Sequence, residues 1–321
     1  MISTNKKNIA ILMGGASVER EISIKSGEHF FSNLNLDEFN AYKIFLSIDP
    51  EWLVRFQDKT YKINKTDFSF YINNEVIRFD AAIILIHGEP AENGELSKYF
   101  DSLNIPYNCC NEHSSLLTFN KYNCNSFLRT ENFNVPKSIV NSLNIENFNF
   151  PCIVKPTTSG SSFGVTKVNF KNDLTNAVEH AKKYSNQFII EEFIEGREIC
   201  CAVHDLEDGK LTSLALTEII SENEIFDYNA KYLGESKEIT PANLDEKLSL
   251  EIKTIAEKAY SKLNLKGIVR FDFILRDEIA YIIEVNTIPG FSKESIVPKM
   301  IKASNQEIKD FVSKLLNRII I

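Results

Sequence analysis

The sequence predicts an α/β fold whose N-terminal part is built on a parallel sheet. An apolar run at 6–15 ends in two glycines, and a helical pattern follows it at 17–35. Two further strand-like runs lie at 41–48 and 80–88, with helical or loop material between them. This alternation of strands and helices is typical of α/β proteins with a parallel sheet.

Length and composition limit the possible classes of protein. A chain of 321 residues is too long for one compact core, so we expect two or three domains. The net charge of −8 argues against nucleic acid as the main partner, because a basic surface is missing. The first apolar run, 9–13, is too short for a signal peptide or a membrane span, so we expect a cytoplasmic chain without membrane contact. The six cysteines show no C-x-x-C spacing, and we expect them to be reduced and buried.

The first predicted helix has a recognisable beginning. Ser17 is a candidate N-cap, and Glu19 and Glu21 follow in the first turn, where the helix dipole favours acidic side chains. Gly14 and Gly15 precede it, but the G-x-G-x-x-G pattern of a dinucleotide-binding fold is absent. An oxidoreductase built on this unit is therefore disfavoured.

Beyond residue 110 the pattern changes. A helical segment is expected at 111–133, with an apolar stripe formed by Leu116, Leu117, Phe119 and Phe127. The remaining elements, in chain order, are expected as strands at 152–156 and 164–170, a helix at 173–185, strands at 188–194, 198–203 and 211–220, an irregular polar stretch at 221–241, and helices at 244–264 and 305–320.

Two strands that flank residues 276–278 carry polar side chains among apolar ones. Arg270 and Asp272 share one face of the first strand, and Glu284 and Asn286 lie together on a face of the second. A turn with an odd number of residues places all four on the same face, with opposed side chains about 5 Å apart. Two carboxylates and an amide oxygen in this arrangement suit magnesium. The alternative is a solvated face on which the arginine neutralises the acids.

A serine- and glycine-rich loop lies between two predicted strands. Lys155 precedes it, and it contains Ser159, Ser161 and Ser162. Backbone N–H groups, hydroxyls and a lysine together suit phosphate oxygens. The alternative is an ordinary flexible turn, since the lysine precedes the glycines and no helix follows, unlike a Walker A loop.

The strand at 188–194 leads into several acidic residues. Phe193 and Ile194 offer apolar walls for a base, and the acids, among them Glu191 and Glu198, offer acceptors for an amine and for ribose hydroxyls. The alternative is a strand end with solvated acids.

The polar stretch contains "FDYNAKYL" at 226–233, in which Lys231 and Tyr232 supply a cation and a phenol. This composition is typical of an active-site lid, and the alternative is an ordinary long loop.

Taken together and in this order, these motifs resemble the D-alanine–D-alanine ligase family of ATP-grasp enzymes. The resemblance runs from "MGGASVEREIS" at 13–23 to "SIVPKM" at 295–300 and includes "EVNTIPGF" at 284–291. It implies a three-domain ATP-grasp fold with an N-terminal α/β (pre-ATP-grasp) substrate domain at 1–110. A central ATP-grasp subdomain at 111–190 and a C-terminal subdomain at 191–321, with the metal and catalytic residues, would follow.

The resemblance also implies roles at the amino-acid site. Glu19 would hold the ammonium of the first D-alanine and form a hydrogen-bonded trio with Ser161 and Tyr232, and His87 would lie near this substrate. The remaining roles are an oxyanion site formed by Arg270 and the Gly290 amide, and a site for the carboxylate of the second D-alanine at Ser295.

For ATP, the resemblance implies that Lys121, Lys155, Lys231 and Ser162 contact the phosphates. Glu191 would bind the adenine amine, Phe193 and Ile194 would form apolar walls for the base, and Glu198 would bind the ribose. Asp272, Glu284 and Asn286 would bind two magnesium ions, and manganese would be able to replace them.

The implied reaction joins two D-alanines through an acyl phosphate, with ATP hydrolysed to ADP and phosphate, and supplies peptidoglycan synthesis. Relatives of this kind are commonly homodimers. Two alternatives remain open: a ligase of the same fold that takes D-serine or D-lactate as second substrate, and an ATP-binding sensor without turnover.

Overall fold

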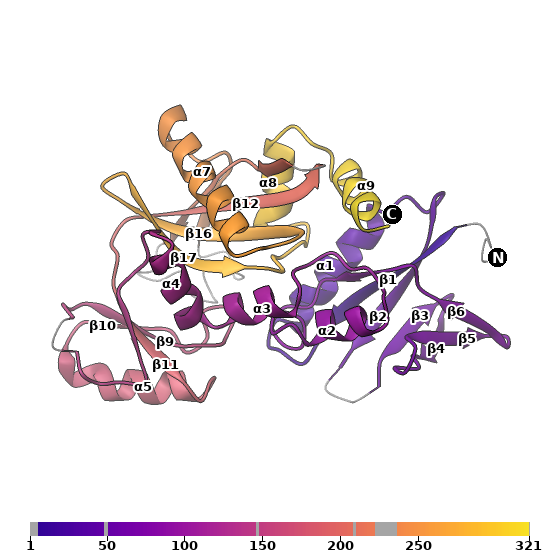
Figure 1. Cartoon of the computed structure of the whole chain (residues 1–321), viewed down its shortest axis with the longest axis horizontal. Helices are drawn as coiled ribbons and strands as arrows, with labels where there is room; N and C mark the ends of the chain where they lie inside the picture. Colours follow the sequence, from indigo (N-terminus) through magenta and orange to yellow (C-terminus); the bar gives the residue numbers. More distant parts are fainter. Residues whose placement is uncertain (1–5, 48–50, 146–147, 208–209, 222–235, 321) are drawn as a thin grey trace.

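The structure is a computed structural model of the chain, and it describes residues 6–47, 51–145, 148–207, 210–221 and 236–320. Three sheets follow one another along the chain, and Figure 1 shows them in three parts of the molecule, the first at the right, the second at the lower left and the third at the upper centre. They contain five, four and six strands, and a separate two-stranded hairpin, β5 (Ser69–Ile72) and β6 (Glu75–Arg78), lies beside the first.

The first sheet confirms the predicted parallel arrangement. β1 (Lys7–Gly14) pairs in parallel with β2 (Phe39–Leu46) on one side and with β7 (Ala81–Ile84) on the other. Residues 9–13 of β1 are fully buried, as expected of a strand covered on both faces. The sequence did not reveal the antiparallel extension of this sheet, which consists of β3 (Leu53–Phe56) and β4 (Lys59–Lys62).

The first helix, α1 (Arg20–Ser32), begins three residues later than predicted. Ser17 is not its N-cap. The Ser17 hydroxyl donates to the His87 carbonyl oxygen at 2.9 Å and accepts from the Glu19 N–H at 3.2 Å. The serine therefore ties the loop before α1 to the segment after β7, and Glu19 occupies the position immediately before the helix.

The helical segment predicted at 111–133 is two helices, α3 (Glu112–Phe119) and α4 (Lys121–Thr130). Asn120 separates them with extended backbone, and its side chain accepts from the Asn123 N–H at 3.1 Å as the cap of α4. The predicted apolar stripe is wrong at Leu116, which is 51% exposed, because the buried face of α3 consists of Ser114, Ser115 and Thr118. A further helix, α2 (Glu95–Ser102), precedes this pair.

The central sheet is antiparallel, in the order β10-β9-β11-β8. Its strands are β8 (Ser138–Val140), β9 (Cys152–Pro156), β10 (Thr166–Val168) and β11 (Phe188–Glu192). After a short 3-10 turn, η1 (Lys171–Asp173), the helix α5 (Leu174–Lys182) packs its apolar side chains against this sheet.

The third sheet is also antiparallel, in the order β15-β14-β12-β16-β17, with β13 paired to β12. Its strands are β12 (Arg197–Glu207), β13 (Lys210–Ser213), β14 (Thr217–Ser221), β15 (Ser236–Ile239), β16 (Ile268–Arg276) and β17 (Ile279–Asn286). β15 corrects the prediction of irregular structure up to residue 241. Its polar sequence gives no strand periodicity, and backbone pairing with β14 makes it a strand.

Side chains of β12 alternate between two cores. Ile199 and Cys201 pack with α7 (Glu246–Lys262), which crosses this sheet in Figure 1, while Cys200 lies in a second core. That second core also contains α8 (Ile296–Ala303), α9 (Ile308–Ile319), β1 and α1, so it joins the C-terminal helices to the N-terminal sheet.

All six cysteines are buried, as predicted. Within the described residues, no helix combines the length and the apolar character that a membrane crossing needs.

Candidate active site

The hairpin of β16 and β17 presents one polar face. Arg270 is paired with Asn286, and Asp272 is paired with Glu284, so all four side chains point to the same side of the sheet. Arg270 binds Asp272 through two hydrogen bonds of 2.7 Å each, and the Asn286 amide donates to the same carboxylate at 2.9 Å. Burial lowers the pKa of Arg270, but Asp272, with smaller contributions from Cys200 and Glu284, outweighs this effect, so the pKa lies well above its ordinary value. Arg270 is therefore a fixed cation.

The four side chains share a face, as predicted, but the cause is not the predicted turn. The turn consists of two residues, Asp277 and Glu278, so the expected odd-numbered turn is wrong. Phe273 pairs with Ile282 but Asp272 pairs with Glu284, which leaves one extra residue in β17. This β-bulge, and not the turn, brings the two carboxylates to the same face.

The donor set fits a magnesium site. The two carboxylates are directly opposed, and the Asn286 side chain adds an amide next to them. Oxygen donors of this kind suit magnesium, which keeps water or phosphate oxygens for its remaining positions. In the structure, Arg270 and Lys121 neutralise Asp272 and Glu284 respectively.

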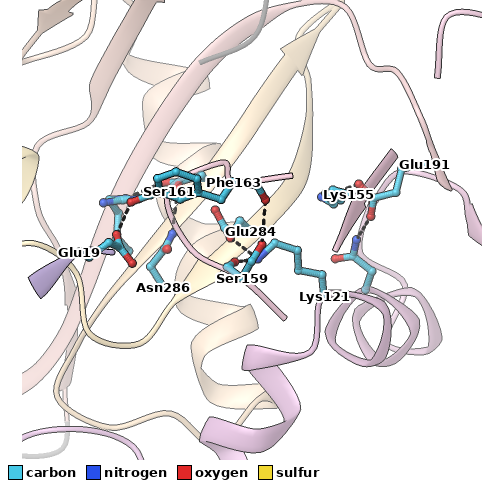
Figure 2. A network of polar contacts seen from close by, with 12 residues as sticks. Glu19, Lys121, Lys155, Ser159, Ser161, Phe163, Glu191, Glu284 and Asn286 are labelled. Carbon is cyan, nitrogen blue, oxygen red and sulfur yellow. Dashed lines mark hydrogen bonds and ion pairs between the residues drawn. The ribbon is translucent and has the colours of Figure 1, made fainter. Parts of the chain in front are cut away.

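Lys121 lies where three segments meet. It is the first residue of α4, and its ammonium lies 2.7 Å from the Glu284 carboxylate and donates to the Ser159 carbonyl oxygen at 2.7 Å. Figure 2 shows this link between α4, the hairpin and the serine loop. Burial lowers the pKa of Lys121, but Glu284 and other nearby acids together raise it by a larger amount, so the pKa is above its ordinary value. The lysine remains charged.

A cavity of about 180 Å³ lies between the central and the third sheet. Every described residue predicted to contact ATP lines it, together with two of the predicted metal ligands. The lining residues among the predictions are Lys121, Lys155, Ser162, Glu191, Phe193, Ile194, Glu198, Asp272 and Glu284.

Lys155 and Glu191 form a buried ion pair in this cavity. They are diagonal neighbours across β9 and β11, since Lys155 pairs with Ile189, two residues before Glu191. Their charged atoms are 2.6 Å apart, and the side chains are 7% and 3% exposed. The Asn125 amide of α4 donates to the other oxygen of Glu191 at 2.8 Å. Figure 2 shows the pair apart from the Lys121 group. Sequence reasoning missed Asn125, because only the packing of α4 on β11 brings it near.

Phe193 has a cation on one face. The Lys167 ammonium of β10, an edge strand of the central sheet, lies 4.3 Å from the centre of the Phe193 ring, so a cation packs on this wall of the cavity. The sequence prediction did not include Lys167.

A second cavity of about 420 Å³ lies between the N-terminal sheet and the polar hairpin. It gathers the predicted amino-acid site. The lining residues among the predictions are Glu19, His87, Lys121, Ser161, Arg270, Glu284, Asn286, Gly290 and Ser295.

Glu19 and the serine loop form one wall of the larger cavity. The Ser161 hydroxyl donates to the Glu19 carboxylate, as Figure 2 shows. A β-carbon at Gly160 would collide with the same carboxylate, so the loop backbone passes close over Glu19. Ser161 and Ser162 both have positive φ, 50° and 59°, a conformation that side chains seldom adopt. The loop is therefore held in a strained form that places Ser161 on Glu19.

His87 points into the same cavity, and its contacts define which ring nitrogen carries the proton. Its Nδ1 lies 2.9 Å from the Ile288 carbonyl oxygen, which only accepts, so Nδ1 carries a proton and donates. Its Nε2 is buried and has no hydrogen-bond partner in the described part of the chain. Burial lowers the pKa of His87, so the ring is neutral and Nε2 offers a lone pair. An amine or a hydroxyl is the partner that this atom requires.

Glu92 is a residue of the larger cavity that sequence reasoning missed. Burial first, then the charges of Glu19 and Glu284, raise its pKa to about 8. The signal in the sequence was weak, because Glu92 lies in a turn five residues after His87 and belongs to no periodic element.

Tyr232 and Lys231, together with the lid predicted at 226–233, lie outside the described residues. The trio expected around Glu19 is therefore described only for its Glu19 and Ser161 members.

The two cavities share Lys121, Ser159 and Glu284 in their linings. A ligand in one cavity can therefore reach a ligand in the other across a lysine and a carboxylate. Such a pair of adjoining sites is suited to the transfer of a group between two bound molecules.

Two family models match almost the whole chain. One described as D-ala D-ala ligase N-terminus matches residues 8–110, and one described as D-ala D-ala ligase C-terminus matches residues 117–317.

The chain is also similar to whole proteins. It is 40% identical to a D-alanine–D-alanine ligase of Azobacteroides pseudotrichonymphae genomovar. CFP2, over 98% of this chain and 100% of the relative. It is 38% identical to one from Phocaeicola vulgatus, over 97% and 98%.

Solved structures agree with these matches. The VanG D-Ala:D-Ser ligase from Enterococcus faecalis superposes with a TM-score of 0.88 at 28% identity, over 98% of this chain and 99% of that chain. A D-alanine–D-alanine ligase from Bacillus anthracis complexed with ATP superposes with a TM-score of 0.75 at 26% identity, over 98% and 95%.

Proposed function

Because the chain belongs to the D-alanine–D-alanine ligase family, we propose that it joins two D-alanines at the expense of ATP. The product, D-alanyl-D-alanine, is a precursor for peptidoglycan synthesis. The supporting observation is that the cavity of the predicted ATP residues and the cavity of the predicted amino-acid residues meet at Lys121, Ser159 and Glu284.

ATP would occupy the smaller cavity with its phosphates toward the larger one. Glu191 would accept from the adenine amine, and Phe193 and Ile194 would pack on the base. Glu198 would bind the ribose. Phosphate contacts would come from Lys121, Lys155 and Ser162, and on binding the two lysines would exchange their carboxylate partners for phosphate oxygens. In this proposal the resting ion pairs keep the cations in place before ATP arrives.

Asp272, Glu284 and Asn286 would hold two magnesium ions, for which manganese can substitute. When bound, the metal offsets the negative charge of the phosphates. The opposed carboxylates and the adjacent amide support this assignment.

In the first step, a carboxylate oxygen of the first D-alanine attacks the γ-phosphorus of ATP, and ADP leaves. Glu19, held by Ser161, would bind the ammonium of this D-alanine. The neutral Nε2 of His87 would accept a hydrogen bond from the same ammonium. These contacts leave the carboxylate directed to Lys121 and the shared wall of the two cavities.

In the second step, the amine of the second D-alanine attacks the acyl carbon. It loses a proton, and phosphate leaves with the electrons of the carbon–oxygen bond. Arg270, fixed by Asp272, and the Gly290 N–H would stabilise the tetrahedral oxyanion. Ser295 would bind the carboxylate of the second D-alanine. Lys231 and Tyr232 would act from the lid.

The organisation around this site is also a proposal. Each of the units 1–110, 111–190 and 191–321 would act as a domain, and the smaller cavity would lie between the last two. The chain would work in the cytoplasm, where ATP is available, and as a homodimer. Analytical ultracentrifugation tests the dimer.

The test of the function is ADP release by the purified chain with ATP and magnesium. D-Alanine should stimulate release and yield the dipeptide, whereas L-alanine should not. D-Serine or D-lactate supplied together with D-alanine tests a mixed product. ATP binding without stimulation by any amino acid would contradict the proposal and favour a nucleotide sensor.

A further inference from the structure

Two serines at the end of the larger cavity form a paired contact. The Ser295 hydroxyl accepts from the Ser292 N–H at 3.0 Å, and the two hydroxyl oxygens are 2.8 Å apart. Ser292 is 6% exposed, whereas Ser295 is only partly buried, and both line the cavity. Ser292 is therefore the inner member of the pair and Ser295 the outer.

The direction of the hydroxyl contact follows from the partners available. Within the described residues, the Ser292 hydroxyl has one partner, the Ser295 hydroxyl. A buried hydroxyl proton without an acceptor is costly, so the Ser292 proton points to Ser295. Both lone pairs of the Ser295 oxygen are then filled by the N–H and O–H of Ser292, because a hydroxyl accepts at most two hydrogen bonds. Its own proton is left to point into the cavity.

The surrounding backbone supports this orientation. Ser295 immediately precedes α8, yet its side chain makes no capping hydrogen bond to that helix. A β-carbon at Gly290 would lie 2.9 Å from the Ser295 oxygen, so the hydroxyl lies against the Gly290 backbone. The free proton of Ser295 is thus presented beside the proposed oxyanion donor and at the positive end of α8.

We propose that Ser292 is a positioning residue that turns the Ser295 hydroxyl into an obligatory donor for the carboxylate of the second amino acid. The proposal rests on the proposed function, since it assumes that Ser295 binds this carboxylate. The reverse arrangement, in which Ser295 donates to Ser292, would turn a lone pair toward the anion. Ser292 therefore favours an acceptor molecule that carries a carboxylate, without touching it.

The test uses the full-length chain and the variant Ser292→Ala, which keeps the N–H and removes the hydroxyl. We expect the KM for the second D-alanine to rise about three- to tenfold, the range of one neutral hydrogen bond. The KM for the first D-alanine should stay the same. Ser292→Thr, which retains a hydroxyl, should restore the KM for the second D-alanine.

A second acceptor separates this role from a general structural effect. Hydroxylamine attacks an acyl phosphate but carries no carboxylate, so hydroxamate formation from one D-alanine should be equal in the wild type and in Ser292→Ala. An equal loss with both acceptors, or no change in the KM for the second D-alanine, would overturn the inference. Failure of the proposed function is visible separately, as absence of ADP release by the wild-type chain.

Discussion

Asp272 and Glu284 lie directly opposite each other on β16 and β17, although only two residues form the turn between these strands. A regular hairpin with this turn would place Ile283 opposite Asp272, because Arg276 pairs with Ile279. The bulge in β17 adds one residue and returns Glu284 to the face of Asp272. One extra residue in a strand thus creates the acidic centre of the site.

Asp272 is expected to be indispensable, because it both fixes Arg270 and faces the proposed metal. Asp272→Asn keeps the shape but removes the charge that holds the guanidinium through two hydrogen bonds. We expect kcat to fall by about 10²–10³, as when an oxyanion donor is lost. ADP release measured over a range of magnesium concentrations checks this. The matched control is Asp277→Asn in the exposed turn, which should behave as wild type. An unchanged kcat in Asp272→Asn would exclude the proposed role.

The pair of Lys155 and Glu191 should matter for stability as well as for ATP. Glu191→Gln leaves Lys155 charged, buried and without its carboxylate, which costs about 3–5 kcal/mol for a buried pair. Urea unfolding without ATP measures this loss, and calorimetry should show weaker ATP binding. Glu192→Gln is the neighbouring control, since its partner Arg276 is 3.5 Å away and both side chains are about one third exposed. Equal stability of the two variants would contradict the assignment.

The raised pKa of Glu92 predicts that the stability of the folded chain depends on pH. Its pKa is raised from 4.5 to about 8, so between these pH values the folded chain keeps a proton that the unfolded chain has released. This group therefore lowers the free energy of unfolding progressively as the pH rises from about 4.5 to about 8, and not beyond. Glu92→Gln removes the effect. Denaturation without magnesium at pH 5 and pH 8 should show the variant gaining stability over the wild type at the higher pH. A difference that is the same at both pH values would mean that the Glu92 pKa is not raised.

His87 is proposed to contact the first D-alanine through its Nε2 atom alone. His87→Asn can keep a donor to the Ile288 carbonyl oxygen but has no atom in the place of Nε2. We expect the KM for the first D-alanine to rise about ten- to a hundredfold, the range of a hydrogen bond to a charged group. Hydroxamate formation with saturating hydroxylamine as the acceptor, measured over a range of D-alanine concentrations, tests this, and the exposed His113→Asn is the control. A KM equal to that of the wild type would show that Nε2 binds no substrate.

The sequence determined those features that depend on local patterns. Apolar runs with period two or with continuous hydrophobicity predicted β1, β9 and the β16 strand, and the polar residues that interrupt them marked the site. The resemblance of the motifs to a known family then indicated the ATP and amino-acid residues. Such features are readable because strand alternation is set within a few residues of chain.

The tertiary structure alone decided how these residues meet. The bulge that aligns Asp272 with Glu284 depends on the register in which β16 pairs with β17. The approach of Asn125 to Glu191 depends on contact between segments distant in the chain. The buried environment that raises the pKa of Glu92 and the packing of Ser292 behind Ser295 depend on how the surrounding chain folds around them. Register, burial and electrostatic environment are properties of packed neighbours, and a one-residue change in pairing reverses the face of every side chain without altering the hydrophobic pattern.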